Sequence, residues 1–325
     1  MIRYQESGIR HQGRCRGFAA PFYQPARSAD NNLIPDFCPL IPERGFTLLE
    51  MIVVIVITGI LGGIVAIFIK APVQGYVDSA RRAEMTDIAD TALRRITRDV
   101  RLALPNSVRV TSSGANFYLE FIPTTGGGRY RAGAPGDELN FASGTDATFA
   151  VLGPSGVAAT ATDFVAIYNL GIPSASGVCT ALGADAYEGC NRRPAVSGGT
   201  TITFTPDGVL PFPFASPGNR FHIVTTPVTY VCAPAAGGGG TLTRYWGYAM
   251  QPLQPSSVAA APLSTAPASA PLATNVGAVA GGGCSFAYQA NVGAQRTGLV
   301  TLQLAITKSG ESVSLYNASH VSNEP

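Results

Sequence analysis

The sequence predicts an α+β fold, in which one long N-terminal helix packs on an antiparallel β-sheet domain. Two observations predict this class. An apolar run covers residues 46–69 with Glu50 as its sole charged side chain, and a helical apolar pattern continues to residue 104. Beyond Pro105 the apolar pattern changes to a period of two, which is typical of strands.

The first half of the helix is predicted to span a membrane. At about 1.5 Å per residue, residues 46–69 reach roughly 36 Å, which exceeds a bilayer core of about 30 Å. The second half is predicted to be amphipathic up to residue 104, with a kink at Pro72 because proline removes a backbone hydrogen bond. Its expected apolar stripe consists of Val73, Val77, Met85, Ile88, Ala92, Ile96, Val100 and Ala103.

Basic side chains gather near the predicted end of this helix, at Arg94, Arg95, Arg98 and Arg101. The negative end of the helix dipole favours cations there. We therefore interpret the cluster as a solvated helix end, with a partner-binding patch as the alternative.

Residues 105–325 are predicted to form one β-rich domain. The runs with a period of two, separated by turn residues, are 117–122, 164–170, 201–205, 221–225, 228–232, 242–250, 285–288, 299–307 and 312–319. The last two are predicted to form a hairpin around residues 308–311. The Gly-rich segment 126–136 and the low-complexity insertion 251–283 are expected to lack regular structure.

Four cysteines of this domain predict two disulfides. Three pairings are open, and we favour Cys179–Cys190, which closes a short polar loop, with Cys232–Cys284. The second bridge would enclose the long insertion, where a cross-link removes the most chain entropy. A metal site is the weaker alternative because CxxC and HxxxH spacings are absent from the sequence.

Charge and motifs exclude several function classes. Without residues 1–45, the chain has 16 basic and 16 acidic residues, and a neutral chain lacks the basic surface that nucleic acids require. The sequence contains no GxSxG motif, P-loop or dinucleotide fingerprint. We therefore expect neither an enzyme nor a cofactor or resident metal. His222 is expected to be a strand residue rather than a general base, and His320 a structural residue.

The aromatic residues Tyr245, Trp246 and Tyr248 are the strongest candidates for ligand binding. We expect them to pack on a sheet face. The alternative is a membrane-anchored carbohydrate-binding domain, which would require these rings to be exposed.

Residues 44–50, Arg-Gly-Phe-Thr-Leu-Leu-Glu, open the apolar run. A carboxylate within a membrane span costs about 2.5–3.5 kcal/mol, so Glu50 requires a reason. This segment resembles the type IV pilin signal. The resemblance implies cleavage between Gly45 and Phe46 by prepilin peptidase, and methylation of the new Phe46 amine. It also implies that Glu50 serves assembly by pairing with the N-terminal amine of a neighbouring subunit.

The same resemblance makes residues 1–45 a leader. The apolar run follows the cleavage site, unlike in a secretory signal peptide, and is therefore retained. The leader is longer than is usual in this family, so we weigh a start site assigned too far upstream, with initiation near Leu33, against a long leader. Arg44 before the span favours a cytoplasmic N-terminus and a periplasmic domain, anchored in the inner membrane by a single pass.

Within the family, the large domain and the two predicted bridges favour a minor pilin or pseudopilin that primes or caps a filament at its tip on the cell surface. The chain is similar to the O-type minor pilin of mannose-sensitive haemagglutinin pilus biogenesis, through residues 186–192, 220–224, 244–248 and 320–323. The J-type pseudopilin of type II secretion is the alternative. The implied partners are prepilin peptidase, the major and other minor pilins, and the inner-membrane assembly platform.

Overall fold

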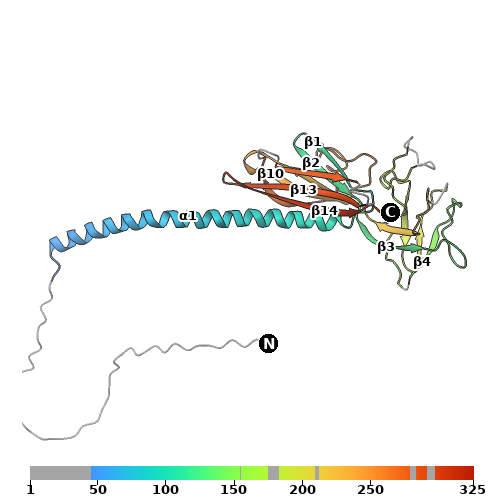
Figure 1. The fold of residues 1–325 in the computed structure, drawn as a ribbon, viewed down its shortest axis with the longest axis horizontal. Coiled ribbons are helices and arrows are strands. Elements are labelled where there is room, and N and C mark those ends of the chain that lie inside the picture. Colours follow the sequence, from blue (N-terminus) through green and yellow to red (C-terminus); the bar gives the residue numbers. More distant parts are fainter. Residues whose placement is uncertain (1–44, 154, 175–182, 209–211, 279–282, 291–296) are drawn as a thin grey trace, which may run out of the picture. The chain divides into compact units, whose positions relative to one another are not determined.

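The computed structural model describes residues 45–325, except 154, 175–182, 209–211, 279–282 and 291–296 (Figure 1). Most of the predicted leader, and Cys179, lie outside the described residues. The described chain contains one long helix, an eight-stranded sheet and a closed β-barrel. The predicted α+β class, with an antiparallel sheet domain after the helix, is confirmed.

Helix α1 extends over the 53 residues Leu48–Val100 and includes Pro72 without interruption. Every helix residue up to position 77 is exposed. Val73 and Val77 were predicted to lie on the packed stripe, but the β domain contacts the helix only from about Arg81 onward. The buried face repeats at helical spacing and consists of Met85, Ala89, Ala92, Leu93, Ile96 and Val100.

The sheet packs on this buried face of α1. Its strands are antiparallel in the order β1-β2-β9-β10-β11-β13-β12, with β14 paired to β13 (Figure 1). The shared core combines helix residues such as Ile96 with Leu119, Tyr230 and Leu302. The strands are β1 Arg109–Ser113, β2 Asn116–Phe121, β9 Val228–Ala233, β10 Gly240–Trp246, β11 Ala268–Val276, β12 Cys284–Gln289, β13 Thr297–Lys308 and β14 Glu311–Ser322, with a 3-10 turn at Ala236–Gly238.

The barrel has its own core, which is rich in aromatic rings. Phe149 and Phe221 meet edge to face at 5.0 Å between ring centroids, and Tyr130, Phe204 and Phe212 complete the cluster. The strands close in the order β3-β4-β7-β6-β5-β8. They are β3 Thr124–Tyr130, β4 Thr148–Leu152, β5 Phe164–Ala166, β6 Arg192–Ser197, β7 Thr201–Phe204 and β8 Arg220–Val224.

Two segments that were predicted to lack regular structure contain strands. Residues 126–130 belong to β3, where a Cβ on Gly127 would lie 2.9 Å from the Phe221 carbonyl oxygen, so glycine permits close pairing with β8. Residues 268–276 of the insertion form β11, which pairs with β10. Pro271 is accommodated beside a register shift at Leu242/Thr243. Backbone pairing with a neighbouring strand therefore orders these segments despite their small side chains.

The predicted hairpin and one predicted disulfide are present. β13 and β14 are joined by Ser309 and Gly310. Cys232 of β9 and Cys284 of β12 are bonded, with both residues fully buried and 6.4 Å between their Cα atoms. Cys190 is also buried and disulfide-bonded, but Cys179 lies outside the described residues, so that pairing stays a prediction.

Candidate processing and assembly site

The start of α1 places the predicted cleavage site outside the helix. Gly45 and Phe46 are non-helical and exposed, and Phe46 retains 80% of its accessible surface. Thr47 caps the helix, because its Oγ1 accepts a hydrogen bond from the Glu50 N–H at 3.2 Å and its carbonyl accepts one from the Met51 N–H at 3.2 Å. The Gly45–Phe46 peptide bond is therefore free of helical hydrogen bonds and accessible to a peptidase.

Glu50 occupies the third position of the helix, in its first turn. The positive end of the helix dipole stabilises a carboxylate here by about 0.3–1 kcal/mol. The spacing Thr47-x-x-Glu50 is also that of a capping box, in which a threonine and a glutamate satisfy the first free N–H groups. The motif therefore stabilises the start of α1 in addition to any role in assembly. This second role was readable from the spacing, but the sequence analysis missed it.

The helix beyond this start presents apolar side chains on all sides. None of its most apolar stretch is buried in the structure. Among the described residues, α1 is the one helix long and apolar enough to cross a membrane. Transfer of one large apolar side chain out of water contributes about 1.5–3 kcal/mol, so this segment requires apolar surroundings.

A network of asparagines connects the segment after α1, the barrel side and the C-terminal residues, and three of them, Asn169, Asn191 and Asn323, are buried. Asn169 Nδ2 donates to the Pro105 carbonyl at 2.7 Å, and its Oδ1 accepts from Asn191 Nδ2 at 3.1 Å. Asn106 Nδ2 donates to the carbonyl oxygens of Asn169 at 2.9 Å and Asn323 at 3.3 Å. The resembling segments 186–192 and 320–323 thus each supply a residue to one network, which sequence reasoning did not identify.

A buried ion pair lies beside this network. The Arg109 Nε donates to Glu120 Oε2 at 2.7 Å, and Glu120 has no exposed surface. Burial raises the pKa of the Glu120 carboxyl, and Arg109 opposes this shift. Tyr248 donates to the same carboxylate at 2.9 Å, and the Arg109 guanidinium stacks 3.5 Å from the Tyr187 ring centroid. These groups hold β1, β2 and the segment after β10 together.

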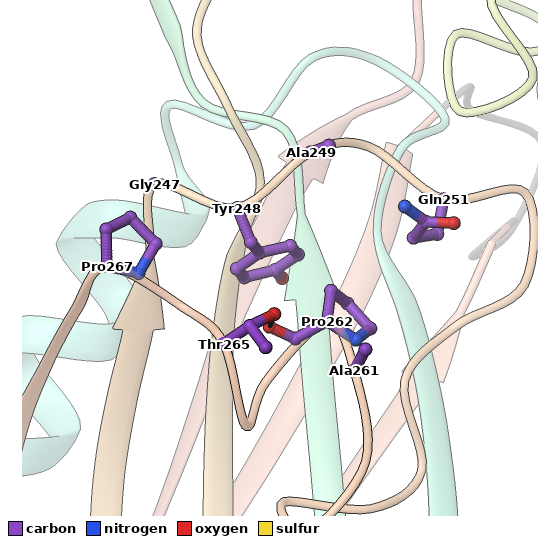
Figure 2. A pocket seen from close by; sticks show the side chains of 8 residues that line it. All are labelled: Gly247, Tyr248, Ala249, Gln251, Ala261, Pro262, Thr265 and Pro267. Atoms are coloured by element: carbon purple, nitrogen blue, oxygen red, sulfur yellow. Dashed lines mark hydrogen bonds between the residues drawn. The ribbon is translucent and has the colours of Figure 1, made fainter.

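The aromatic run packs on the sheet instead of lying exposed. Tyr248 is 4% exposed, and Tyr245 and Trp246 are half-buried against the cores. Tyr248 lines a pocket of about 400 Å³. In Figure 2 its ring lies between Pro262 and Pro267, which line the same pocket. The carbohydrate-binding alternative required exposed rings, so this run does not support it.

The remaining candidates do not form a reactive group. Burial, with a smaller contribution from Arg220, lowers the pKa of His222 to about 4, and its Nε2 has no hydrogen-bond partner among the described residues. His320 is exposed on β14. Within the described ranges, no group of three His, Cys, Asp or Glu side chains could hold a metal ion. Arg94 forms an ion pair with Asp90, and Arg95 forms one with Asp99. Both pairs are consistent with a solvated helix end.

Comparison with known protein families finds one match. Residues 42–66 match the prokaryotic N-terminal methylation motif. Neither the curated proteins nor the solved structures contain a match to this chain. The matched segment includes Gly45, Phe46 and Glu50, and the helix that follows fits a single-pass membrane anchor. The motif, the apolar helix and the antiparallel β domain together support a type IV pilin-like structural protein.

Proposed function

We propose that this chain is a minor pilin or pseudopilin. Prepilin peptidase cleaves it between Gly45 and Phe46, the new amine is methylated, and residues 46–69 hold it in the inner membrane. The domain lies in the periplasm until the subunit joins other minor pilins and the major pilin on the assembly platform. The observation that carries this proposal is the exposed, non-helical Gly45–Phe46 bond directly before an exposed apolar helix, within a methylation motif.

Cleavage creates a new positively charged amine on Phe46, which gives the Glu50 carboxylate a partner. The new amine on Phe46 lies at the positive end of the α1 dipole, which disfavours a cation. In a bundle of apolar helices this amine also loses water, and an unpaired buried charge is strongly unfavourable. A neighbouring subunit's Glu50 provides the counter-charge. The same carboxylate lies in the first turn of its own helix, where the helix dipole favours a negative charge, so two separate roles must be distinguished.

The size of the domain supports a place at the tip of the filament. The barrel adds a second core beside the sheet that packs on α1. A wide subunit suits the tip, because no further subunit stacks above it, and there it primes or caps a pilus of the mannose-sensitive haemagglutinin type. The alternative is a J-like pseudopilin, which would be encoded beside an outer-membrane secretin and exported hydrolases rather than pilus genes.

The test is the intact mass of the protein from cells with and without prepilin peptidase. The expected mature mass begins at N-methyl-Phe46 and occurs only with the peptidase. The same unprocessed N-terminus in both strains would contradict the proposal and leave a membrane-anchored β domain.

Substitutions then separate the two roles of Glu50. Glu50→Val is expected to be processed but absent from filaments. Glu50→Gln keeps a side chain suited to a capping box and removes the charge, so its absence from filaments would assign the effect to charge. Glu84→Val is the matched control, because Glu84 is a helix carboxylate with an exposed ion pair to Lys308, and it is expected to assemble.

A further inference from the structure

β14 is a long, regular strand at one edge of the sheet. It pairs with β13 over its 12 residues, from Lys308↔Glu311 to Thr297↔Ser322, without a register shift. The connecting residues Ser309 and Gly310 have φ values of 53° and 81°, which is the pattern of a type I′ turn. In such a two-residue hairpin, the flanking pair Lys308 and Glu311 exchanges hydrogen bonds.

The hairpin register determines which backbone groups of β14 are open. Hydrogen-bonded pairs recur every second residue in an antiparallel ladder, so the odd-numbered residues of β14 bond to β13. The even-numbered residues direct their N–H and C=O groups away from the sheet. Their side chains are also exposed, and they are Ser312, Ser314, Tyr316, Ala318, His320 and Ser322. Among the described residues, β14 makes no backbone–backbone hydrogen bond outside the β13 ladder, and of its outward carbonyls that of His320 accepts from the Ser319 hydroxyl at 3.4 Å.

The usual protections of an exposed edge are absent from β14. Natural edge strands are short, bulged or covered, or contain Pro or Lys, because an open edge pairs with other chains. β14 contains no Pro, Lys or Arg. The segment after β10 packs against β1, at another end of the sheet: Gln254 donates to the Arg109 carbonyl at 3.1 Å, and the Arg109 side chain donates to the Gln251 and Pro252 carbonyls. Among the described residues, no strand pairs with the outer side of β14.

The direction of β14 restricts what can pair with it. Arg82 bonds Glu311 at 3.0 Å and Arg101 bonds Ser319 at 3.4 Å, so β14 runs in the same direction as α1, as Figure 1 also shows. If a second copy paired its β14 antiparallel to this strand, its α1 would also run in the opposite direction, because α1 and β14 run the same way in each copy. Two chains anchored in one membrane cannot adopt that arrangement. The favoured antiparallel neighbour is therefore a strand of a different chain, directed opposite to the packed part of α1.

The edge also indicates the chemistry of that strand. Val313 and Leu315 lie half-buried on the helix-facing side of β14, and an added strand would cover them with apolar side chains. The other side presents Ser314 and Tyr316, which suit small polar neighbours. Arg82 already pairs with Glu311, so the edge offers no charge to select an ionic partner. We propose that the open edge of β14 binds an extended, uncharged segment of a different exported protein, with alternating apolar and polar residues, as an additional antiparallel strand.

Photo-crosslinking of the full chain in its own cells tests this proposal. Benzoylphenylalanine replaces Ser314, Tyr316 or Ala318 in turn, and the cross-linked peptides are identified by mass spectrometry. All expected adducts lie in one segment of the partner. When the probe moves two residues toward the C-terminus of β14, the cross-linked partner residue is expected to move two residues toward the partner's N-terminus, as antiparallel pairing requires. Leu253, which is 83% exposed elsewhere on the domain, is the control position and is expected to give no such series.

A second pair of variants separates backbone pairing from side-chain contact. Ser314→Pro removes one outward N–H and leaves the β13 ladder intact, and is expected to reduce the adduct from position 316 at least fivefold. Ser314→Ala keeps the N–H and is expected to leave it unchanged. Cross-links within the chain, to a second copy, or without antiparallel register would overturn the proposal, as would the absence of an adduct. Processing at Gly45 is measured separately, so failure here does not affect the proposed function.

Discussion

Replacement of Arg109 by Met is expected to destabilise the domain by about 3–5 kcal/mol at neutral pH, because it leaves a fully buried carboxylate without its counter-ion. Methionine retains an apolar stem beside Tyr187, so most of the packing is preserved. Two hydrogen bonds from the guanidinium to the Gln251 and Pro252 carbonyls are also lost. The charge on Glu120 therefore accounts for one part of the cost, and pH isolates that part.

The pH dependence has a definite sign. Burial already raises the Glu120 pKa, and without Arg109 it rises further. The folded variant then binds this proton more tightly than the unfolded chain, so its stability falls as pH rises above the ordinary carboxyl pKa. For one proton the change is at most about 1.4 kcal/mol per pH unit. The loss relative to the parent protein is expected to be smallest near pH 5 and to grow toward pH 7.

Urea unfolding of the mature protein in detergent measures this effect. Trp246 is the sole tryptophan and packs against the sheet core, so its fluorescence reports on that core. Glu120→Gln in the Arg109→Met background is expected to recover stability at pH 7, because an amide requires no counter-charge and still accepts from Tyr248. A loss that is constant between pH 5 and 8, with no recovery in the double variant, would refute the reasoning.

Three further predictions use the same unfolding measurement. Cys232→Ala with Cys284→Ala is expected to cost about 4 kcal/mol, because the bridge spans 52 residues of chain, and a loss below about 1 kcal/mol would contradict this. Ile96→Ala is expected to cost about 2–5 kcal/mol and the exposed Val73→Ala less than about 0.5 kcal/mol, so equal losses would be inconsistent with the burial boundary on α1. His222, with a pKa of about 4 when folded, is expected to destabilise the protein by up to about 3 kcal/mol as pH falls from 6.5 to 4, and His222→Gln should abolish that dependence.

The sequence predicted those elements whose own side chains repeat with a clear period. The buried face of α1 and the alternation in β13 and β14 are examples. Strands β1, β4 and β6 were not predicted. Strands β3 and β11 were also missed, because their Gly, Ala, Ser and Pro residues supply little apolar area. Those strands are held by pairing with β8 and β10, which is a property of the neighbouring strands.

The site shows the same division. Gly45, Phe46 and Glu50 lie within one short segment of the sequence, so their pattern is readable without a structure. The asparagine network joins residues 63 and 217 positions apart, and nothing in its spacing reveals it. The Arg109–Glu120 pair lies directly opposite across β1 and β2, and a prediction of the hairpin at Gly114 would have located it.

The boundary between exposed and buried residues on α1 determines how the molecule responds when its surroundings change. The first residue of α1 that is buried in the sheet core is Met85, and the helix residues up to position 77 contribute nothing to that core. The free energy of folding of the β domain is therefore independent of the medium around the apolar half. In the proposed function, that half moves from lipid to a bundle of other helices, and the contacts of the domain core need not change during that move.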